Sequence, residues 1–490
     1  MAELPSTLPA VTEQPPAESM TRVHTPSLIH QSLYLHELPI EIIIQIFTLV
    51  LIDRHEFVVI LAQLSRYLRQ IVLSTPELWS TVSPVRKTNA PEMARLWRSR
   101  NNGLVKALCI HSFELAPIQE IFYAFEAFCD LPLDALRILT IDGWAYRSIC
   151  IFLPNLAPSV MAKLHSLHLR DSNDAWLNEV SGSLSLRCLI AEHSLIDFLK
   201  LADHATELRH LVYVDEFILW STSDVLWVLH RNPNLQSIYI DSNGWNRIPN
   251  GDRPEPSSLA RELPSCIVVP HLASLTIAGR LEGLWPGLSL PNLRAVDFTS
   301  AWQDIYSLLI NLRSNGSVLN LVSLSLSIRF PYAVRDDLLQ RAVIQFLREA
   351  KQLEYLQLFS FTYIKDIIHA LSQEPTELCP NLATLDLSQC NEACAELLVP
   401  LVEARNGQSF NIERQVLDSH DGASGDGHAR VSPLQKLVLN KCRLMAVDQV
   451  ILPWLKQRVS HVTCDYKCTQ RERQVKPYQF SCASVPLQMR

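Results

Sequence analysis

The cysteines and histidines are the residues of this sequence best suited to chemistry, and their spacing does not build a reactive centre. Two Cys-x-x-x-Cys pairs, Cys390/Cys394 and Cys464/Cys468, could each contribute ligands to a zinc ion. A structural zinc ion needs four ligands, and neither pair has a second pair at the spacing that such sites use. The sequence therefore favours buried or surface thiols, with no metal site.

Motifs of enzymes are missing as well. The chain has neither a glycine-rich phosphate loop nor a nucleophile elbow, and its 16 histidines are dispersed. His165 and His168 fall at outward positions of a predicted strand, which suits a binding surface better than a catalytic pair. We therefore expect a protein without catalytic residues, metal or cofactor. The alternative, an enzyme hidden in the repeats or loops, has no supporting motif.

Charge and hydropathy narrow the class of partner and the compartment. The 490 residues carry a net charge of -7 and the pI is about 6.2, whereas nucleic-acid-binding domains usually have a pI above about 9. Residues 1–20 lack the basic start and apolar stretch of a signal peptide. The longest apolar run, residues 42–52, is shorter than the roughly 20 residues that span a bilayer. We expect no nucleic acid, no membrane, and a cytoplasmic and/or nuclear location, where the 12 cysteines stay reduced.

One spacing pattern recurs along most of the chain: apolar, two free positions, apolar, one free position, apolar. Leu164, Leu167 and Leu169 illustrate it. Its first position falls at Leu136, Leu164, Leu208, Leu235, Leu272, Leu293, Leu321, Leu353, Leu382 and Leu434, and in weaker copies at Val105, Leu186 and Val459. Most spacings lie in or near the range of roughly 20–29 residues that is typical of leucine-rich repeats.

The pattern dictates an architecture. Its last two apolar positions are two residues apart, so they point to the same side of a short strand, toward the core. Apolar residues at helical spacing follow several strands and predict return helices near residues 223–230, 302–313, 335–352, 363–372 and 447–455. We predict an α/β fold: a small α-helical domain, then a leucine-rich-repeat solenoid with parallel strands on the concave face and helices on the convex face.

The free strand positions predict where a client protein binds. They point away from the core, to the concave face that repeat proteins use for binding. Aromatic side chains anchor many interfaces, so the stronger candidates include two tyrosines and a histidine pair. The client-binding candidates are His165, His168, Arg170, Tyr239, Tyr355 and Gln357.

The segment before the repeats has a different pattern. Leu38-Pro39 followed by Glu41 predicts a helix start, because Pro is favoured in the first turn. Apolar residues then recur through residues 42–47 and 57–72, and the segment closes with Ser74-Thr75-Pro76-Glu77-Leu78-Trp79-Ser80. This order resembles the F-box, in particular the fungal-type F-box-like sequences, over residues 34–83. Residues 64–68 depart from the family's Val-Cys-Arg-x-Trp, since Ser65 and Leu68 replace Cys and Trp.

The resemblance implies a function. F-boxes bind the Skp adaptor subunit, and through it a cullin, in Skp–cullin–F-box ubiquitin ligases. The residues that it assigns to this contact are Leu38, Pro39, Ile42, Ile43, Ile46, Leu64, Leu68 and Ile71. The expected role is therefore a substrate adaptor for an unknown client protein, with Trp79 holding the module to the array. Alternatively, these helices only cap the solenoid core, and the chain is an interaction scaffold without ligase recruitment.

Composition predicts the boundaries of the domains, tails and loops. Residues 1–30 are rich in proline and predict a disordered tail. The F-box-like domain spans 34–83, a linker 84–104, the solenoid 105–470 and a C-terminal tail 471–490. Two segments rich in glycine, serine and charged or amide residues, 245–258 and 406–432, predict loop insertions in the array.

Overall fold

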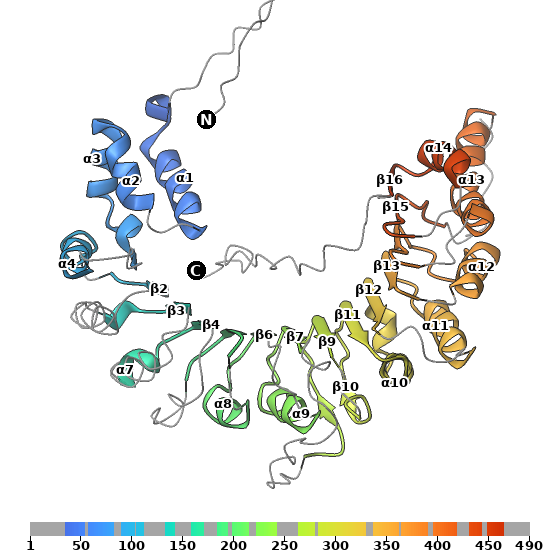
Figure 1. Ribbon diagram of the computed structural model, residues 1–490, viewed down its shortest axis with the longest axis horizontal. Coiled ribbons are helices and arrows are strands. Elements are labelled where there is room, and N and C mark those ends of the chain that lie inside the picture. The colour runs from blue at the N-terminus through green and yellow to red at the C-terminus, as the bar shows by residue number, and fades with distance from the viewer. Residues whose placement is uncertain are drawn as a thin grey trace, which may run out of the picture.

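The described chain forms an arc with strands on its inner side and helices on its outer side. The computed structural model describes residues 35–53, 57–82, 90–102, 104–111, 133–142, 158–170, 184–194, 198–214, 222–242, 263–279, 283–329, 337–361, 364–390, 395–418, 431–442 and 448–464. Three helices stand at the N-terminal end of the arc, and the strands follow one another along its inner edge (Figure 1). The predicted α/β leucine-rich-repeat solenoid is confirmed.

The N-terminal module is a small helical bundle. It consists of a 3-10 turn Leu35–Glu37, α1 Ile40–Asp53, α2 Phe57–Leu64, α3 Arg66–Ser74 and a second 3-10 turn Pro76–Trp79. Pro39 stands directly before α1, where its missing N–H costs no helical hydrogen bond. Ser65 separates α2 from α3 and caps α3, since its Oγ accepts a hydrogen bond from the Leu68 N–H at 3.1 Å.

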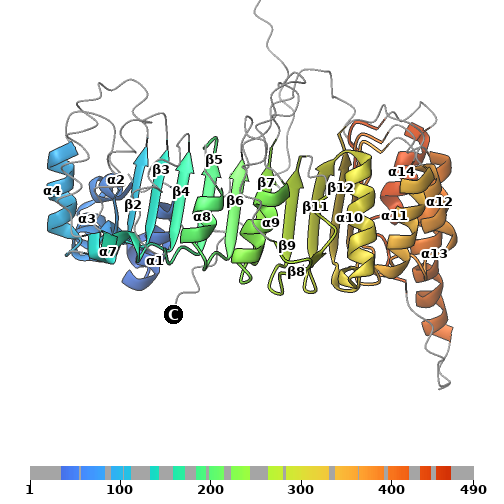
Figure 2. The same cartoon turned by 90° about the horizontal axis from the view of Figure 1, so that it is seen from below.

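A single parallel sheet lines the concave face, and its 14 described strands follow the order of the chain, with β8 and β10 set apart. The strands of the sheet are β1 Thr81–Val82, β2 Ala107–His111, β3 Ile138–Asp142, β4 Ser166–Arg170, β5 Cys188–Glu192, β6 His210–Val214, β7 Ser237–Asp241, β9 Ser274–Ala278, β11 Ala295–Ser300, β12 Ser323–Ile328, β13 Tyr355–Phe359, β14 Thr384–Asp386, β15 Lys436–Val438 and β16 His461–Thr463. Figure 2 shows β2 to β7, β9, β11 and β12 of this sheet side by side.

The register of the sheet follows the sequence pattern. Leu139 lies opposite Leu167, which lies opposite Leu189, and the same position stays aligned from β2 to β16. In β4 the side chains of Leu167 and Leu169 are buried, while those of His168 and Arg170 are not. The predicted alternation between core and concave face is confirmed in β4, β6 and β7, whereas four successive residues of β5, Cys188 to Ala191, are all buried. The register matters because a one-residue slip would turn every side chain of a strand to the other face.

Helices and short turns return the chain across the convex side. The described elements are α4 Ala90–Arg100, α7 Pro158–Met161, α8 Phe198–His204, α9 Thr222–Arg231, α10 Trp302–Ser314, α11 Asp337–Glu349, α12 Lys365–Gln373, α13 Ala395–Asp418 and α14 Asp448–Arg458, with 3-10 turns at Leu133–Ala135 and Ser317–Asn320. A two-stranded sheet of β8 Ile267–Val268 and β10 Leu288–Ser289 takes part in the same layer. All five return helices predicted from the sequence are present.

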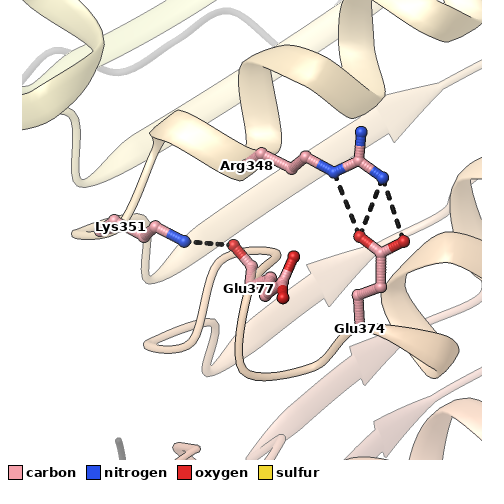
Figure 3. A network of polar contacts seen from close by, with 4 residues as sticks. All are labelled: Arg348, Lys351, Glu374 and Glu377. Carbon is pink, nitrogen blue, oxygen red and sulfur yellow. Dashed lines mark hydrogen bonds and ion pairs between the residues drawn. The ribbon is translucent and has the colours of Figure 1, made fainter.

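Charged pairs connect consecutive convex helices. Arg313 of α10 approaches Glu349 of α11 at 2.9 Å through its Nε. Arg348, also in α11, donates to both carboxylate oxygens of Glu374, which follows α12, at 2.9–3.1 Å (Figure 3). Lys351 Nζ also donates to the Glu377 carbonyl in this region. Such exposed pairs contribute little free energy singly.

Three expected boundaries differ from the structure. The 84–104 linker contains α4, and β1, within the expected F-box-like segment, pairs in parallel with β2 and starts the sheet. The loop expected over 406–432 is helical through 418, as the second half of α13. The leucines and valines in the first turns of α13 start a helix that continues past residue 406, and the glycine-rich composition after residue 418 concealed this continuation in the sequence. The 245–258 insertion and both tails, 1–30 and 471–490, lie outside the described residues. No helix in the described ranges is long and apolar enough to cross a bilayer.

Candidate binding surfaces

Helix α1 has two apolar faces, and only one of them is covered. Ile43, Phe47 and Leu51, at i, i+4 and i+8, are buried in the core of the module. Ile42, Ile46 and Leu49 follow another line along the helix, at i, i+4 and i+7. Of these, Ile46 is half-buried, Ile42 is exposed and Leu49 keeps 66% of its surface exposed. We call Ile42, Ile46 and Leu49 the apolar stripe. Ile46 packs in part against the module core, whereas Ile42 and Leu49 leave the stripe open to solvent.

The eight residues assigned to the adaptor contact divide between surface and core. Pro39, Ile42 and Leu64 are exposed, while Leu38 and Ile46 are half-buried. Ile43, Leu68 and Ile71 are buried at 6% exposure or less, which corrects their expected place in the contact surface. The physical reason is that three short helices share one core, so the most central apolar position of each helix must fill it.

Other exposed apolar residues of the module went unnoticed in the sequence. Leu49 and Val50 lie near the end of α1, Ile60 lies on α2, and Tyr67 lies in the first turn of α3. Leu49 could have been found from its spacing, because it stands seven residues after Ile42. Ile60 is likewise four residues before Leu64, which is 62% exposed. The module thus presents more apolar surface than its own core requires, and exposed apolar patches of this kind mark interaction sites.

Ser65 has a structural explanation. Its side chain caps α3 by accepting the Leu68 N–H, one of the helix N-terminal donors that would otherwise lack a partner. Leu68 in turn is buried in the module core. Ser65 and Leu68 therefore preserve the helix pair and its core.

The candidate client residues on the concave face fall into separate rows. Strand pairing aligns Tyr239 with Thr276, Asp297, Ser325 and Gln357, one residue per strand. Tyr355 lies two positions earlier on β13, in the row of Ser237. With strands about 4.8 Å apart, the four steps from β7 to β13 separate the two strands by about 19 Å, and the offset of two residues along the strand brings the separation of the tyrosines to about 20 Å. Both are half-buried on the concave side, but they do not form one anchor.

Polar contacts connect several of these candidates. His168 Nε2 lies 3.9 Å from Glu192 Oε1, and Arg170 Nε lies 3.7 Å from Glu192 Oε2. Farther along, Ser325 Oγ donates to Gln357 Oε1 at 2.8 Å, and Gln357 Nε2 donates to Asp386 Oδ2 at 3.0 Å. His168, Arg170 and Gln357 are therefore engaged within the sheet.

His165 lies apart from His168, directly before β4, where its backbone N–H donates to the Arg137 carbonyl at 2.8 Å. Burial lowers the pKa of His165 below its usual range, and the charges of Arg187 and Arg137 lower it further, opposed by Glu207. The ring Nδ1 is buried and has no hydrogen-bond partner within the described part of the chain. His165 therefore lies in a positively charged environment.

Two cysteines of the array, Cys390 and Cys442, have a structural role. Cys390 Sγ donates to the Leu358 carbonyl and Cys442 Sγ to the Leu387 carbonyl, each at 3.0 Å and each across to the preceding repeat. In the repeat that contains β5, Ser194 occupies the position equivalent to these cysteines, and its Oγ donates to the Leu169 carbonyl of the preceding repeat at 3.3 Å. Burial raises the pKa of Cys390 to about 12 and that of Cys442 to about 11. The described residues contain no group of three or more potential metal ligands.

Comparison with known proteins finds matches only among solved structures. No protein-family model and no curated protein matches the chain. Among solved structures, an internalin (inlF) from Listeria monocytogenes has 13% identity and a TM-score of 0.37 over 85% of this chain and 95% of its own. A protein from Bacteroides fragilis has 13% identity and a TM-score of 0.30 over 73% and 71%, and an LRR protein from Leptospira interrogans 12% and 0.30 over 78% and 88%. Similarity this low transfers no function to the chain.

Proposed function

We propose that this protein is the substrate-recognition adaptor of a Skp–cullin–F-box ubiquitin ligase. The module of residues 34–83 would bind the Skp adaptor, and the concave face of the repeats would bind a client protein. The observation that carries the proposal is the apolar stripe on α1. It adds an uncovered apolar face to a module whose motif order resembles the F-box, at the end of a solenoid built for protein binding.

The proposed mechanism is proximity. The module is fixed to the array by burial of Trp79 and by pairing of β1 with β2. A client held on the concave face would therefore keep a defined position relative to the ligase core, which raises the effective concentration of its lysines at the ubiquitin-charged enzyme. In this proposal the chain supplies no catalytic residue and no cofactor, and it acts in the cytoplasm or nucleus.

Capture of purified Skp adaptor by the full chain tests this role. The decisive variant is Ile42→Asp/Leu49→Asp, which places two carboxylates on the apolar stripe, where desolvation in an interface would be costly. The matched control is Leu319→Asp, since Leu319 is also exposed but lies on a 3-10 turn far along the array. We expect wild type and control to bind alike and the double variant to bind at least tenfold more weakly, with unchanged circular dichroism.

An interaction scaffold without ligase recruitment is the second candidate. Burial of Ile43, Leu68 and Ile71 favours it, because these residues then serve the core of an N-terminal cap. Absence of Skp binding by the folded wild-type chain would sink the adaptor role and leave this candidate in its place.

A further inference from the structure

A row of basic residues runs along one edge of the concave face. Lys106, Arg137, His165, Arg187 and Arg209 each stand immediately before a strand, from β2 to β6. The backbone N–H of each donates to the carbonyl of the one before it, at 2.8 Å in all four steps. We call these five residues the basic row. At about 4.8 Å per strand, the row is about 19 Å long.

The positive charges of the basic row are accessible to a ligand. Lys106 and Arg209 are exposed, and Arg137 and Arg187 are half-exposed. Within the described ranges, none of these four cations takes part in an ion pair with Asp or Glu. Arg137 Nη1 donates only to main-chain carbonyls, that of Leu136 at 2.9 Å and that of Asp134 at 3.5 Å.

The opposite edge of the sheet, where the strands end, differs in the pairing of its charges. There Glu192 lies within 4 Å of both His168 and Arg170, so its charge is balanced inside the sheet. Asp241, at the end of β7, interacts electrostatically with Arg329. Glu192 and Asp241 thus have cationic partners, whereas Lys106, Arg137, Arg187 and Arg209 form no ion pair with Asp or Glu within the described ranges.

The basic row is also confined to one part of the array. On the next two strands of the sheet the same position holds Gln236 and Ala273, and farther along it holds Arg294, Val322 and Glu354. The cations therefore form one segment next to the N-terminal module. In the proposed adaptor, this segment of the concave face is the part nearest to the ligase core.

We propose that the basic row binds an extended acidic segment of the client protein, lying across the starts of β2 to β6. This inference rests on the proposed client-binding role of the concave face and gives the chemistry of the client. An extended chain rises about 3.3 Å per residue and turns every second side chain to one side, so about six residues span the row and three face it. Three Asp or Glu side chains at alternate positions would complement the cations.

An acidic polypeptide fits better than a nucleic acid. The whole chain carries a net charge of -7, which repels a long polyanion, and nucleic-acid affinity depends on many phosphate contacts over a large basic surface. A short acidic segment needs only the local row.

Fluorescence anisotropy with labelled peptides and the full-length protein tests the proposal. The probe is a twelve-residue peptide that alternates Glu with Ser, and its control alternates Gln with Ser. The variants are Lys106→Glu/Arg209→Glu, which changes only exposed side chains, and Arg137→Glu/Arg187→Glu. The charge-preserving variant is Arg137→Lys/Arg187→Lys. A matched control, Arg341→Glu/Lys365→Glu, reverses two exposed charges on the convex helices α11 and α12.

We expect the Glu peptide to bind the wild type in low salt, at least tenfold more tightly than the Gln peptide. Each row reversal should weaken binding at least tenfold, while the lysine variant and the convex control stay within threefold of wild type. Equal affinity for both peptides, or equal effects of row and convex reversals, would overturn the proposal. So would tighter binding of a single-stranded oligonucleotide of matched charge.

Skp capture by the same variants separates this inference from the proposed function. Normal Skp capture without peptide binding would rule out the basic row as a binding site and leave the proposed adaptor role intact. Peptide binding without Skp capture removes the ligase role and leaves an acidic-segment-binding scaffold.

Discussion

Trp79 and Trp97 meet edge to face, with ring centroids 5.7 Å apart and planes at 76°. Trp79 closes the helical module and Trp97 belongs to α4, which leads into β2. Both indoles are buried, and both donate hydrogen bonds to main-chain carbonyls, Trp79 to Val72 at 2.8 Å and Trp97 to Thr81 at 3.0 Å. This pair fixes the end of the module to the start of the array, as expected for Trp79 from the sequence.

Replacing Trp97 should loosen this junction. We expect Trp97→Ala to cost about 3–5 kcal/mol locally, the range for truncation of a buried aromatic residue. Hydrogen exchange should rise in residues 57–82 and in β2, and stay unchanged in β12 to β14, because each repeat contacts only its neighbours. Trp97→Phe keeps a ring in place and should show a smaller rise. Uniform loss of protection along the array would contradict this local role.

The two apolar faces of α1 should respond differently to truncation. Ile43→Ala removes a fully buried side chain and should lower the free energy of unfolding of the module by about 2–5 kcal/mol. Leu49→Ala removes an exposed side chain and should change it by no more than about 0.5 kcal/mol. Urea unfolding followed by tryptophan fluorescence measures both. A large cost for Leu49→Ala would show that the apolar stripe is covered within the protein.

Two polar groups of the array should contribute very different free energies. Asn406 is buried and serves the next repeat: its Oδ1 accepts the Leu434 N–H at 2.8 Å, and its Nδ2 donates to the Leu434 carbonyl at 3.0 Å. Asn406→Ala should therefore cost about 1–3 kcal/mol, the penalty for leaving a buried group unpaired. Arg348→Ala breaks the exposed pair with Glu374 and should cost less than about 1 kcal/mol. Urea midpoints in the reverse order would refute this ranking.

Asp297 should make stability depend on pH. Burial raises the pKa of this carboxyl above 3.8, opposed by a hydrogen bond with Ser325. Between pH 3.8 and the raised pKa the folded protein holds more protons than the unfolded chain, so stability falls as pH rises through this window. The substitution Asp297→Asn removes the titrating group, so this fall in stability with rising pH should disappear. The variant should be more stable than wild type at pH 7, and the difference should shrink as pH falls toward 3.8.

Thermal unfolding of both proteins between pH 4 and pH 7 measures this difference. Asp366→Asn, at an exposed position in the first turn of α12, controls for the removal of one negative charge. A variant less stable than wild type at pH 7 would mean that the charged hydrogen bond with Ser325 outweighs the cost of burial.

The sequence by itself determined the repeat architecture. Each copy of the pattern carries its own alternation of period two, and successive copies such as Leu167 and Leu189 repeat the same register. The core positions, the concave positions and the five return helices follow from such local periodicity, because every repeat solves the same packing problem with its neighbours. The motif order that resembles the F-box is likewise a local property of residues 34–83.

Only the tertiary structure decided which residues share a surface. Ile43 and Leu49 are both apolar residues of α1. Packing of α1 against α2 and the 3-10 turn Pro76–Trp79 buries Ile43 and leaves Leu49 exposed. The members of the basic row stand 22 to 31 residues apart in sequence, and they become neighbours only because the strands stack in register. The spacing along the strand predicts that His165 and His168 share a surface, whereas the charged neighbours of His165, Arg137 and Arg187, come from the adjacent repeats. Contacts between repeats are long-range, so no local pattern of residues contains them.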